Sequence, residues 1–505
     1  MSKGSFISNT LSFSLATFFS RILGYLRDAT IAFFFGANPL TDAFFIAWKL
    51  PNTFRQLLGE GSFNAVFIPI YTEELKNNPK SAQEYINSLF TYYILFITFL
   101  TLTLIIFADF VVKILAPGFI EKSIFDETVN LIRLLLPYLI LVSIVSFFMA
   151  LLNTKDRFFL PAFTPALLNL SFIVSAFIFA NSLGIYSLVI GALFGGFLQV
   201  ITLIPVFFKE GFRIRFTLKV HPSIKKTLKK LAPAFASFGV NQFSFIIDTI
   251  IASFLLGGAI SYLYYANRIF QLPIGVFAIG LGNALLVSLS KHFTNKDFKA
   301  FTTDFNRGIQ LSVFISLPAT VGMIVLGKEI IELLLVRGKF TDTDATFTNL
   351  ALIGYSLGLL GYAVSRPFKS AFFSTGDTKT PLYATIFGVI VGIVFAILFG
   401  FILNMGVFGL ALASSMVGYS TTLYLYLKSN FVIDLKKILI TFSKVLLASI
   451  LMGIAVYIFK GFFESVIVKV FGGILIGATC YFITVKLLKE ESFDIFIKTL
   501  KRKKG

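Results

Sequence analysis

Long apolar runs, each followed by a short polar stretch, recur from one end of this chain to the other. A helix needs about 20 mostly apolar residues to cross a lipid bilayer, and these runs are about that long or longer. The pattern therefore predicts an all-α integral membrane protein with about 14 transmembrane helices. We expect the spans at residues 8–36, 40–75, 86–115, 129–152, 162–181, 185–208, 231–256, 260–291, 309–336, 347–373, 381–404, 407–428, 438–459 and 465–487.

The polar loops differ in charge according to the side of the membrane on which the count of spans places them. An even count puts both ends of the chain on one side, where the loops include the basic stretch Lys209–Lys230 and the tail Lys498–Lys504. The opposite loops carry few cations. Since cytoplasmic loops are enriched in Lys and Arg, both termini are predicted to be cytoplasmic, at the bacterial inner membrane. The cluster Lys225–Lys230 is expected to contact anionic lipid headgroups.

Composition supports a membrane protein and argues against other classes. Of the 505 residues, 56% are hydrophobic and only 14% charged, whereas soluble domains carry about a quarter charged residues. The net charge of +19 would suit a nucleic-acid-binding protein, but its concentration in short loops between apolar runs favours membrane topology instead. We expect no nucleic-acid partner.

Cysteine and histidine are too scarce for several kinds of site. Cys480 is the one cysteine, and His221 and His292 are the two histidines, so neither a disulfide framework nor a Cys- or His-based metal site is expected. The stretch Met1–Phe35 contains Arg21 and Arg27 and has no small-residue cleavage site. It is interpreted as the first membrane helix rather than a removable signal peptide.

Two segments about 220 residues apart resemble each other. Residues 28–51 and 248–273 each begin with an Asp inside an apolar run and end with Leu-Pro, with a cation shortly before it. The matched pairs are Asp28 with Asp248, Lys49 with Arg268, and Pro51 with Pro273. Six spans separate the copies, so the repeats are parallel, and two pseudo-symmetric six-helix lobes around a central cationic cavity are typical of transporters.

This repeat divides the chain into four predicted parts. Residues 1–220 form an N-terminal lobe with helices 1 to 6, and residues 221–430 form a C-terminal lobe with helices 7 to 12. Residues 431–490 hold two extra helices, and residues 491–505 are a basic cytoplasmic tail.

The first predicted span carries a polar stripe. At about 100° per residue, Ser20, Arg21, Gly24, Arg27 and Asp28 share an arc of about 120° on an otherwise apolar helix. Charged side chains within a membrane cost several kcal/mol each and are retained mainly where they face a wet cavity and serve a function. The stripe is therefore a candidate binding surface.

The second predicted span adds Asp42, Lys49, Asn52 and Arg55, with Pro51 in its middle. Proline removes a backbone hydrogen bond, and the stretch Gly59–Ser62 that follows is expected to interrupt the helix. Broken helices in membranes occur where they line a cavity.

Arg268 in the eighth span brings the number of candidate arginines to four, and these predict an anionic ligand. A guanidinium keeps its charge and offers a fork of donors that suits phosphate oxygens, so several arginines suit a diphosphate. The alternative is internal ion pairing, such as Arg27 with Asp28 or Asp42. For Arg55, which lies near the end of a span, the side chain could instead extend to the lipid headgroups.

Other candidate chemistry is limited. Asp248 in the seventh span is a candidate for coupling to a cation or a proton, with a protonated, hydrogen-bonded Asp as the alternative. The stretch Gly322–Lys328 matches part of a P-loop, but Glu329 stands where Ser or Thr is required, inside a predicted span. The G-x-x-x-G pairs Gly191–Gly195 and Gly388–Gly392 indicate helix packing. No cofactor and no metal site are expected.

At these residues the sequence resembles the MurJ (MviN) family of lipid II flippases, within the superfamily that also contains the MATE exporters. The motifs run through most of the chain up to about residue 430 and are most specific in the first 70 residues. They are Ser20–Asp28, Asp42–Phe44, Leu50–Arg55, Gly59–Ser62, Phe67–Pro69, Ala116–Phe119, Leu152–Thr154, Arg157–Phe158, Pro161–Phe163, Tyr264–Arg268 and Arg337–Phe340.

The resemblance implies a flippase that moves undecaprenyl-diphosphate-linked peptidoglycan precursor from the cytoplasmic to the outer leaflet by alternating access. It assigns the cavity arginines to Arg21, Arg27, Arg55 and Arg268, with neighbouring polar positions at Ser20, Asp28, Asp42, Lys49 and Asn52. The two extra helices would form a groove for the lipid tail, and Asp248 matches a candidate ion site. The eleventh span is purely apolar here, which departs from the polar partners that a sodium site would require.

Transport of lipid II as a monomer, with a coupling ion or the membrane potential as its driving force, is thus the favoured hypothesis, and no enzymatic activity is expected. An exporter of another polyprenyl-diphosphate-linked oligosaccharide is the nearest alternative. A MATE-like exporter of organic cations is disfavoured because a cationic cavity repels such cargo. A membrane glycosyltransferase or phosphatase would need more carboxylates, and a metal, than the spans provide. A scaffold that transports nothing would leave the paired lobes and the intramembrane charges unexplained.

Overall fold

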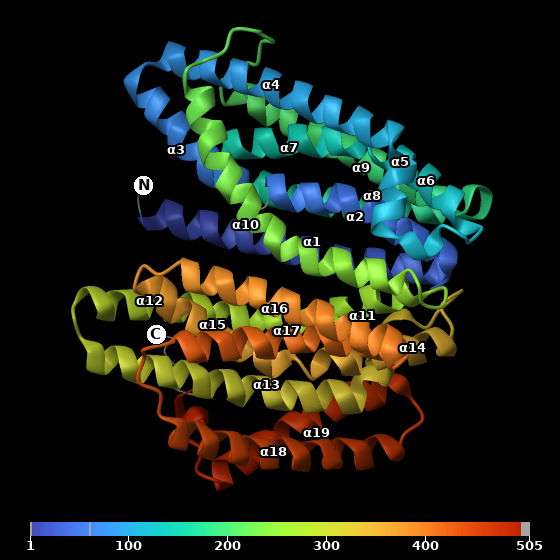
Figure 1. Ribbon diagram of the computed structural model, residues 1–505, viewed down its shortest axis with the longest axis vertical. Coiled ribbons are helices and arrows are strands. Elements are labelled where there is room, and N and C mark those ends of the chain that lie inside the picture. Colours follow the sequence, from blue (N-terminus) through green and yellow to red (C-terminus); the bar gives the residue numbers. More distant parts are fainter. Residues whose placement is uncertain (1–2, 60–61, 496–505) are drawn as a thin grey trace. The chain divides into compact units, whose positions relative to one another are not determined.

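The computed structural model describes the backbone of residues 3–59 and 62–495, and their side chains except those of residues 3–14, 58, 59, 62, 232–245, 276, 277 and 279. Within this part every regular element is a helix (Figure 1). By its internal contacts the chain divides into two compact units. The first comprises Met1–Ile260 with Arg337–Phe340, and the second comprises Ser261–Val336 with Thr341–Gly505.

The first unit contains the helices that the sequence pattern predicted for the first half of the chain, together with α10. Its helices are α1 (Lys3–Phe35), α2 (Pro39–Gly59), α3 (Ser62–Asn77), α4 (Pro79–Ile106), α5 (Ala108–Leu115), the short 3-10 helix η1 (Pro117–Phe119), α6 (Ile124–Leu135), α7 (Tyr138–Asn153), α8 (Phe159–Leu183), α9 (Tyr186–Lys209) and α10 (Ser223–Ala252).

The second unit contains the remaining helices, including two short π-helical segments. They are α11 (Ala259–Pro273), whose first two residues belong to the first unit, η2 (Ile274–Ala278), α12 (Ile279–Thr294), α13 (Phe298–Leu335), α14 (Asp342–Ser356), α15 (Leu359–Ser374), α16 (Lys379–Ile397), η3 (Leu398–Ile402), α17 (Gly406–Lys428), α18 (Leu435–Gly461) and α19 (Val466–Leu487).

Each predicted span falls on one helix or on two or three consecutive helical elements. The predicted span 40–75 is divided between α2, which ends at Gly59, and α3, which begins at Ser62. This agrees with the expected interruption at Gly59–Ser62, although residues 60 and 61 lie outside the described residues. The predicted spans 86–115, 129–152, 260–291 and 347–373 are likewise each divided between two helices.

Ten helical segments in the described part of the chain are long and apolar enough to cross a membrane. The prediction of an all-α integral membrane protein is therefore confirmed, while the number fourteen and the lobe boundaries at residues 220 and 430 stay predictions. The predicted spans 8–36, 40–75, 231–256 and 260–291 are not among the ten. These four contain every predicted site residue, and each also includes residues whose side chains lie outside the described part of the chain.

Small residues set the closest helix contacts, as predicted for the two G-x-x-x-G pairs. In the first unit, a Cβ added at Gly191 would lie 2.9 Å from the backbone of Phe172, so α9 packs directly on α8. In the second unit, a Cβ added at Gly388 would lie 2.3 Å from the Thr421 hydroxyl oxygen, so α16 packs directly on α17. Both pairs thus serve helix packing.

The last two helices pack as a pair on α13 within the second unit (Figure 1). Their shared core includes Phe314 and Leu326 of α13, Met452 and Val456 of α18, and Tyr481 of α19. The Tyr481 hydroxyl also donates a hydrogen bond of 2.6 Å to the backbone oxygen of Phe314. These are the two extra helices that the sequence pattern predicted after the repeat.

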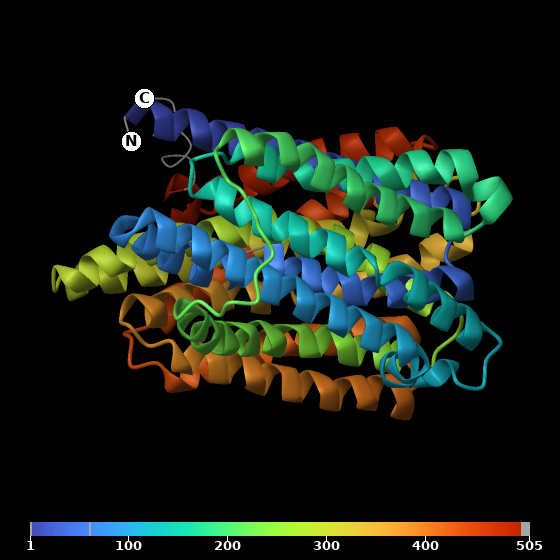
Figure 2. The ribbon, with the colours of Figure 1, turned by 90° about the horizontal axis from the view of Figure 1, so that it is seen from above.

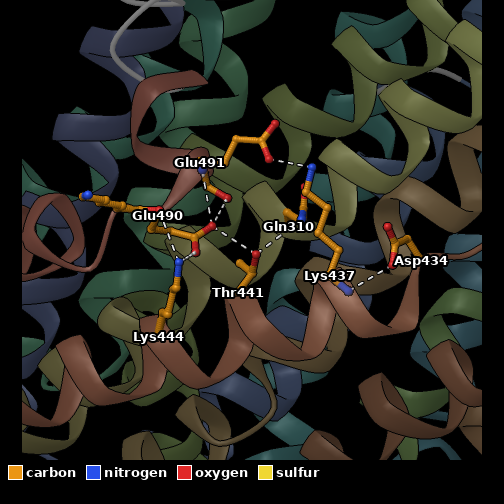
Figure 3. A network of polar contacts seen from close by, with 9 residues as sticks. Gln310, Asp434, Lys437, Thr441, Lys444, Glu490 and Glu491 are labelled. Atoms are coloured by element: carbon orange, nitrogen blue, oxygen red, sulfur yellow. Dashed lines mark hydrogen bonds and ion pairs between the residues drawn. The ribbon is translucent and has the colours of Figure 1, made fainter.

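A buried carboxylate fastens the end of this pair (Figure 3). Glu490, only 4% exposed, accepts hydrogen bonds from the Thr441 hydroxyl at 3.0 Å and from the hydroxyl and backbone N–H of Ser492 at 2.9 and 3.3 Å. Gln310 of α13 donates to the same Thr441 hydroxyl at 3.3 Å, and the Lys444 ammonium lies 4.0 Å from the second carboxylate oxygen. The network therefore joins α13, α18 and the chain after α19.

Replacing Glu490 by Ala should lower the stability of the purified protein by about 2–4 kcal/mol, because several buried donors would lose their acceptor together. Thermal unfolding in detergent would report this as a lower midpoint temperature. Glu464→Ala, at an exposed position between α18 and α19, is the matched control and should leave the midpoint unchanged. Equal midpoints for both variants would contradict the assigned role of Glu490.

Candidate functional site: a cationic cluster in the first unit

Arg27 of α1 is held inside the first unit by an acidic and an amide partner. Its Nη2 lies 2.6 Å and its Nε 3.0 Å from one carboxylate oxygen of Asp28, and its Nη1 donates to the Asn169 side-chain oxygen of α8 at 3.2 Å. Arg27 is 8% exposed and Asp28 3% exposed. Ion pairing of Arg27 with Asp28, predicted as the alternative to ligand binding, is therefore present.

Aromatic rings surround this ion pair. The guanidinium carbon of Arg27 lies 5.7 Å from the centre of the Phe172 ring, which attracts a cation through the negative face of its π-system. Trp48 of α2 lies between Phe172 and Tyr138, with ring centroids 5.1 Å from each. Because Trp48, Tyr138 and Phe172 come from α2, α7 and α8, three helices build one aromatic wall.

Tyr138 links two of the predicted site arginines. The charges of Arg55 and Arg27 both act on its hydroxyl, which places that hydroxyl near the two guanidinium groups. The side chain is fully buried, and its hydroxyl has no hydrogen-bond partner among the described residues. Buried polar groups are nearly always satisfied, so this hydroxyl is a candidate contact for a ligand. The sequence singled out the arginines by charge, and an uncharged Tyr at the start of an apolar run carried no comparable signal.

Four further predicted residues lie on α1 and α2. The Arg55 Nε donates to the Asn52 side-chain oxygen at 3.1 Å, one helical turn away. Arg21 is exposed, and the backbone oxygen of Ser20 accepts a hydrogen bond of 3.1 Å from Asn169. Asn169 therefore contacts both Ser20 and Arg27, which fixes the register of α8 against the polar stripe of α1.

Lys49 and Asp248 come together although they are far apart in the sequence. The Lys49 ammonium of α2 donates to the Thr249 hydroxyl of α10, and the Asp248 carboxylate next to it acts electrostatically on the same ammonium. The positive charge of Lys49 therefore stabilises the negative charge of the Asp248 carboxylate. The protein itself thus supplies a cation for Asp248, the residue predicted to bind a coupling ion.

The Asp42 carboxylate binds a backbone N–H group. One of its carboxylate oxygens accepts a hydrogen bond of 2.7 Å from the Gly258 N–H in the loop after α10, and the side chain is 2% exposed. The Gly118 N–H donates to the Ser253 hydroxyl at 3.0 Å, and a Cβ at Gly118 would lie 2.4 Å from the Ser253 backbone oxygen. These contacts hold the loop after α10 against the start of α2 and against η1.

Arg268, the fourth predicted arginine, lies on α11 in the second unit. Its guanidinium carbon is 5.9 Å from the centre of the Tyr264 ring on the same helix, and its side chain is half-buried. The second unit also contains two cations that the sequence reasoning overlooked, Arg366 and Lys369 of α15. Neither forms an ion pair with an acidic side chain in the described part of the chain, and Lys369 contacts the Thr385 hydroxyl at 3.5 Å. The sequence does indicate them, since two cations lie one helical turn apart within the predicted span 347–373.

The chemistry of these residues differs from that of a metal site. Among the described residues, no group of three or more His, Cys, Asp or Glu side chains could hold a metal ion. The partial P-loop match at Gly322–Lys328 lies inside the long helix α13, as the sequence pattern predicted. Guanidinium groups, amides and a tyrosine hydroxyl are donors that suit phosphate oxygens.

The fold defines a multi-pass helical membrane protein, with ten helical segments in the described part of the chain long and apolar enough to cross a membrane. The fold is shared with an inward-facing MATE-family multidrug resistance transporter of the MOP superfamily, with a TM-score of 0.64 and 16% identity over 81% of this chain and 93% of that one. A family model described as lipid II flippase MurJ matches residues 31–475. The chain belongs to the lipid II flippase MurJ family.

Relatives of nearly equal length support this family assignment. A probable lipid II flippase MurJ of Aquifex aeolicus is 36% identical, with 96% of each chain covered, and one of Rickettsia prowazekii is 32% identical, covering 95% of this chain and 97% of its own. The solved structure of a lipid II flippase MurJ in an inward closed conformation has a TM-score of 0.83 at 30% identity, covering 94% and 98% of the two chains. The predicted family is therefore confirmed, and the roles of the individual site residues stay predictions.

Replacing Asp28 by Asn should lower stability by about 3–5 kcal/mol, because Arg27 would remain as a buried charge without its carboxylate. The thermal midpoint of the purified protein would measure this loss. Asp109→Asn is the control, since Asp109 forms an exposed pair with Lys113 at 3.9 Å, and exposed pairs contribute about 0–1 kcal/mol. A similar small shift in both variants would show that the Arg27–Asp28 pair is not needed for the fold.

Proposed function

We propose that this chain is a flippase that moves lipid II, the undecaprenyl-diphosphate-linked peptidoglycan precursor, from the cytoplasmic to the outer leaflet of the bacterial inner membrane. The observation that carries the proposal is the near-complete match to lipid II flippase MurJ relatives. The arginines and the unsatisfied Tyr138 hydroxyl supply donors that suit a diphosphate. The chain acts as a transporter and not as an enzyme.

In this proposal the diphosphate is bound by Arg27 and Arg55, with Tyr138 donating its free hydroxyl hydrogen to a phosphate oxygen. Arg27 is already paired with Asp28, so the ligand must compete with that carboxylate for the guanidinium. This competition favours release of the diphosphate, because Arg27 forms its ion pair with Asp28 again when the phosphate leaves. A site that bound the diphosphate without such a competitor would turn over slowly.

The remaining predicted residues complete the site. Arg21 and Arg268 are proposed to add charge as the two predicted lobes rock about the ligand, with Ser20, Asn52, Asp42 and Lys49 as polar neighbours. The second unit by itself holds two further half-buried cations, Arg366 and Lys369 of α15. The two extra helices α18 and α19 are proposed to guide the lipid tail, which stays in the hydrocarbon.

Asp248 is proposed as a coupling residue. The Lys49 ammonium interacts electrostatically with the Asp248 carboxylate. A proton or a metal cation that binds Asp248 must therefore compete with Lys49 for that carboxylate. Binding of the ion would thereby release Lys49 from Asp248 and make its charge available to the ligand. The membrane potential is the alternative driving force.

Binding of lipid II to the purified protein, measured by native mass spectrometry, tests the proposed ligand and its site. Arg55→Ala, Arg268→Ala and Tyr138→Phe should each weaken binding by about 10-fold or more, since each removes a hydrogen bond to a charged oxygen. Tyr138→Phe is the sharpest variant, because it removes one hydroxyl that has no other described partner. The same variants should fail to support growth of a bacterium depleted of its own flippase.

Arg307→Ala is the matched control, since it removes a half-exposed arginine at one end of α13 and should bind lipid II normally. Unchanged binding in all three site variants would remove the proposed site. Tighter binding of an O-antigen lipid than of lipid II would favour the other polyprenyl-diphosphate exporter, and stronger binding of an organic cation would favour a MATE-like function.

Both termini are proposed to be cytoplasmic, on the strength of the basic loops. Alkaline phosphatase, which folds only outside the cytoplasm, should be inactive when fused after residue 505 and active when fused after Gly461, between α18 and α19. The reverse pattern of activity would invert the proposed topology.

A further inference from the structure

The segment between α9 and α10 is an extended loop without helical turns (Figure 2). Its backbone is nevertheless held by several hydrogen bonds to α4. Residues 212–221 alternate strictly between apolar and polar side chains, in the order Phe-Arg-Ile-Arg-Phe-Thr-Leu-Lys-Val-His. Alternation of this kind is typical of an extended chain with two different faces. The segment therefore presents an apolar row and a basic row.

Side chains on α4 hold the backbone of this loop. Asn87 accepts from the Arg215 N–H at 3.0 Å, and the Thr91 hydroxyl accepts from the Thr217 N–H at 3.1 Å. Farther along α4, the Tyr92 hydroxyl donates to the Leu218 backbone oxygen at 2.7 Å. The loop thus rises along α4 by more than one helical turn between Arg215 and Leu218.

After Leu218 the chain returns along the same helix. The Ser88 hydroxyl donates to the Lys219 backbone oxygen at 2.7 Å and accepts from the His221 N–H at 3.1 Å. Ser88 precedes Tyr92 by one turn, so the stretch Phe216–Leu218 is the tip of an excursion along α4. Tethers on both arms fix this shape.

The base of the loop is fastened by Glu74 at the end of α3. This carboxylate accepts hydrogen bonds from the hydroxyls of Ser223 and Ser81, the latter at 2.8 Å. The two contacts join the start of α10 to the end of α3 and to the first turn of α4.

The tip exposes large apolar side chains although its backbone is tethered. Phe216 is 72% exposed, Leu218 76% and Val220 65%. By contrast, Phe212 at the start of the loop is 4% exposed and belongs to the aromatic core of the first unit. The exposure at the tip is thus a fixed feature of a tethered loop.

The position along α4 indicates which medium covers this tip. One turn beyond Tyr92, about 5.4 Å farther along the helix, begins the run of exposed apolar side chains Leu95, Phe96, Phe99, Leu102 and Ile106. That run lies on a predicted span that is long and apolar enough to cross a membrane, so we expect it to face lipid. The tip therefore lies next to the start of the lipid-facing surface of the same helix.

The basic row complements the apolar one. Arg213, Arg215 and Lys219 are all exposed and flank the tip, and the exposed Lys225 and Lys229 follow in the first turns of α10. Apolar side chains at interface depth with Lys and Arg at headgroup depth are the arrangement that binds anionic membrane surfaces. We propose that residues 212–221 form a docking site for anionic phospholipid, with Phe216 and Leu218 inserted at the membrane interface and Arg213, Arg215 and Lys219 contacting the lipid phosphates.

A fluorescent probe at the tip tests this proposal in the full-length protein. Cys480, the single cysteine, is first replaced by Ser, and Leu218→Cys is then labelled with an environment-sensitive dye. The protein is placed in nanodiscs of phosphatidylcholine alone or with phosphatidylglycerol, each containing a lipid that carries a quencher near the glycerol. We expect strong quenching with phosphatidylglycerol and weaker quenching without it. A probe at the exposed Asn430, between α17 and α18, should show little quenching in either membrane.

Removing the three loop charges should abolish the difference between the two membranes. Each basic residue near an anionic surface favours contact by roughly fivefold, so the triple variant Arg213→Gln, Arg215→Gln and Lys219→Gln should behave in phosphatidylglycerol as the parent does in phosphatidylcholine. The matched control replaces Lys291, Lys296 and Lys299, which are exposed around the end of α12, by Gln and should keep the difference.

Three outcomes would overturn the proposal. A tip probe that is unquenched in both membranes would place the loop in water, and quenching that is insensitive to phosphatidylglycerol or to the triple variant would remove the basic residues from the interaction. Quenching that vanishes when each disc holds a single protein copy would show that a second copy covers the tip instead of lipid.

Discussion

A buried guanidinium in a membrane protein needs partners, and the ion pair between Arg27 and Asp28 supplies them on the helix that opens the chain. Around this pair the first unit assembles an amide from α8 and aromatic rings from α2, α7 and α8. The packing of these helices depends on that pair, since an isolated charge at this depth would cost several kcal/mol. The proposed anion site would use the same charge, because a carboxylate that neutralises an arginine can also be displaced by a phosphate.

The residues of the proposed site differ in how much they contribute to the stability of the fold. Asp28 and Asp42 are almost fully buried and hold neighbouring parts of the fold together. Arg55 and Lys49 are half-buried and donate hydrogen bonds to Asn52 and Thr249. The Tyr138 hydroxyl has no described hydrogen-bond partner at all. That hydroxyl could therefore bind a ligand without giving up a described hydrogen bond.

Lipid is a structural partner as well as the solvent. Gly191 and Gly388 bring helices into backbone contact, so their packing needs little support from side chains, while the outer faces present large apolar residues such as Phe99 and Phe177. The loop between α9 and α10 continues this outer surface, since polar side chains of α4 bind its backbone and leave Phe216 and Leu218 exposed. A polar face on a membrane helix therefore serves here to position a neighbouring segment.

The sequence by itself determined the class, the positions of the helices and the family, because apolar runs, loop charges and short motifs are properties of neighbouring residues. It also identified the candidate charges and offered pairing of Arg27 with Asp28, which are adjacent. Only the tertiary structure decided that Arg27 meets Asn169, that Lys49 meets Thr249 and that Asp42 holds Gly258, contacts that join residues 142, 200 and 216 positions apart. It likewise revealed Tyr138 and the tethered loop. Such partners depend on how whole helices pack, and packing energies are summed over many side chains that no local pattern records.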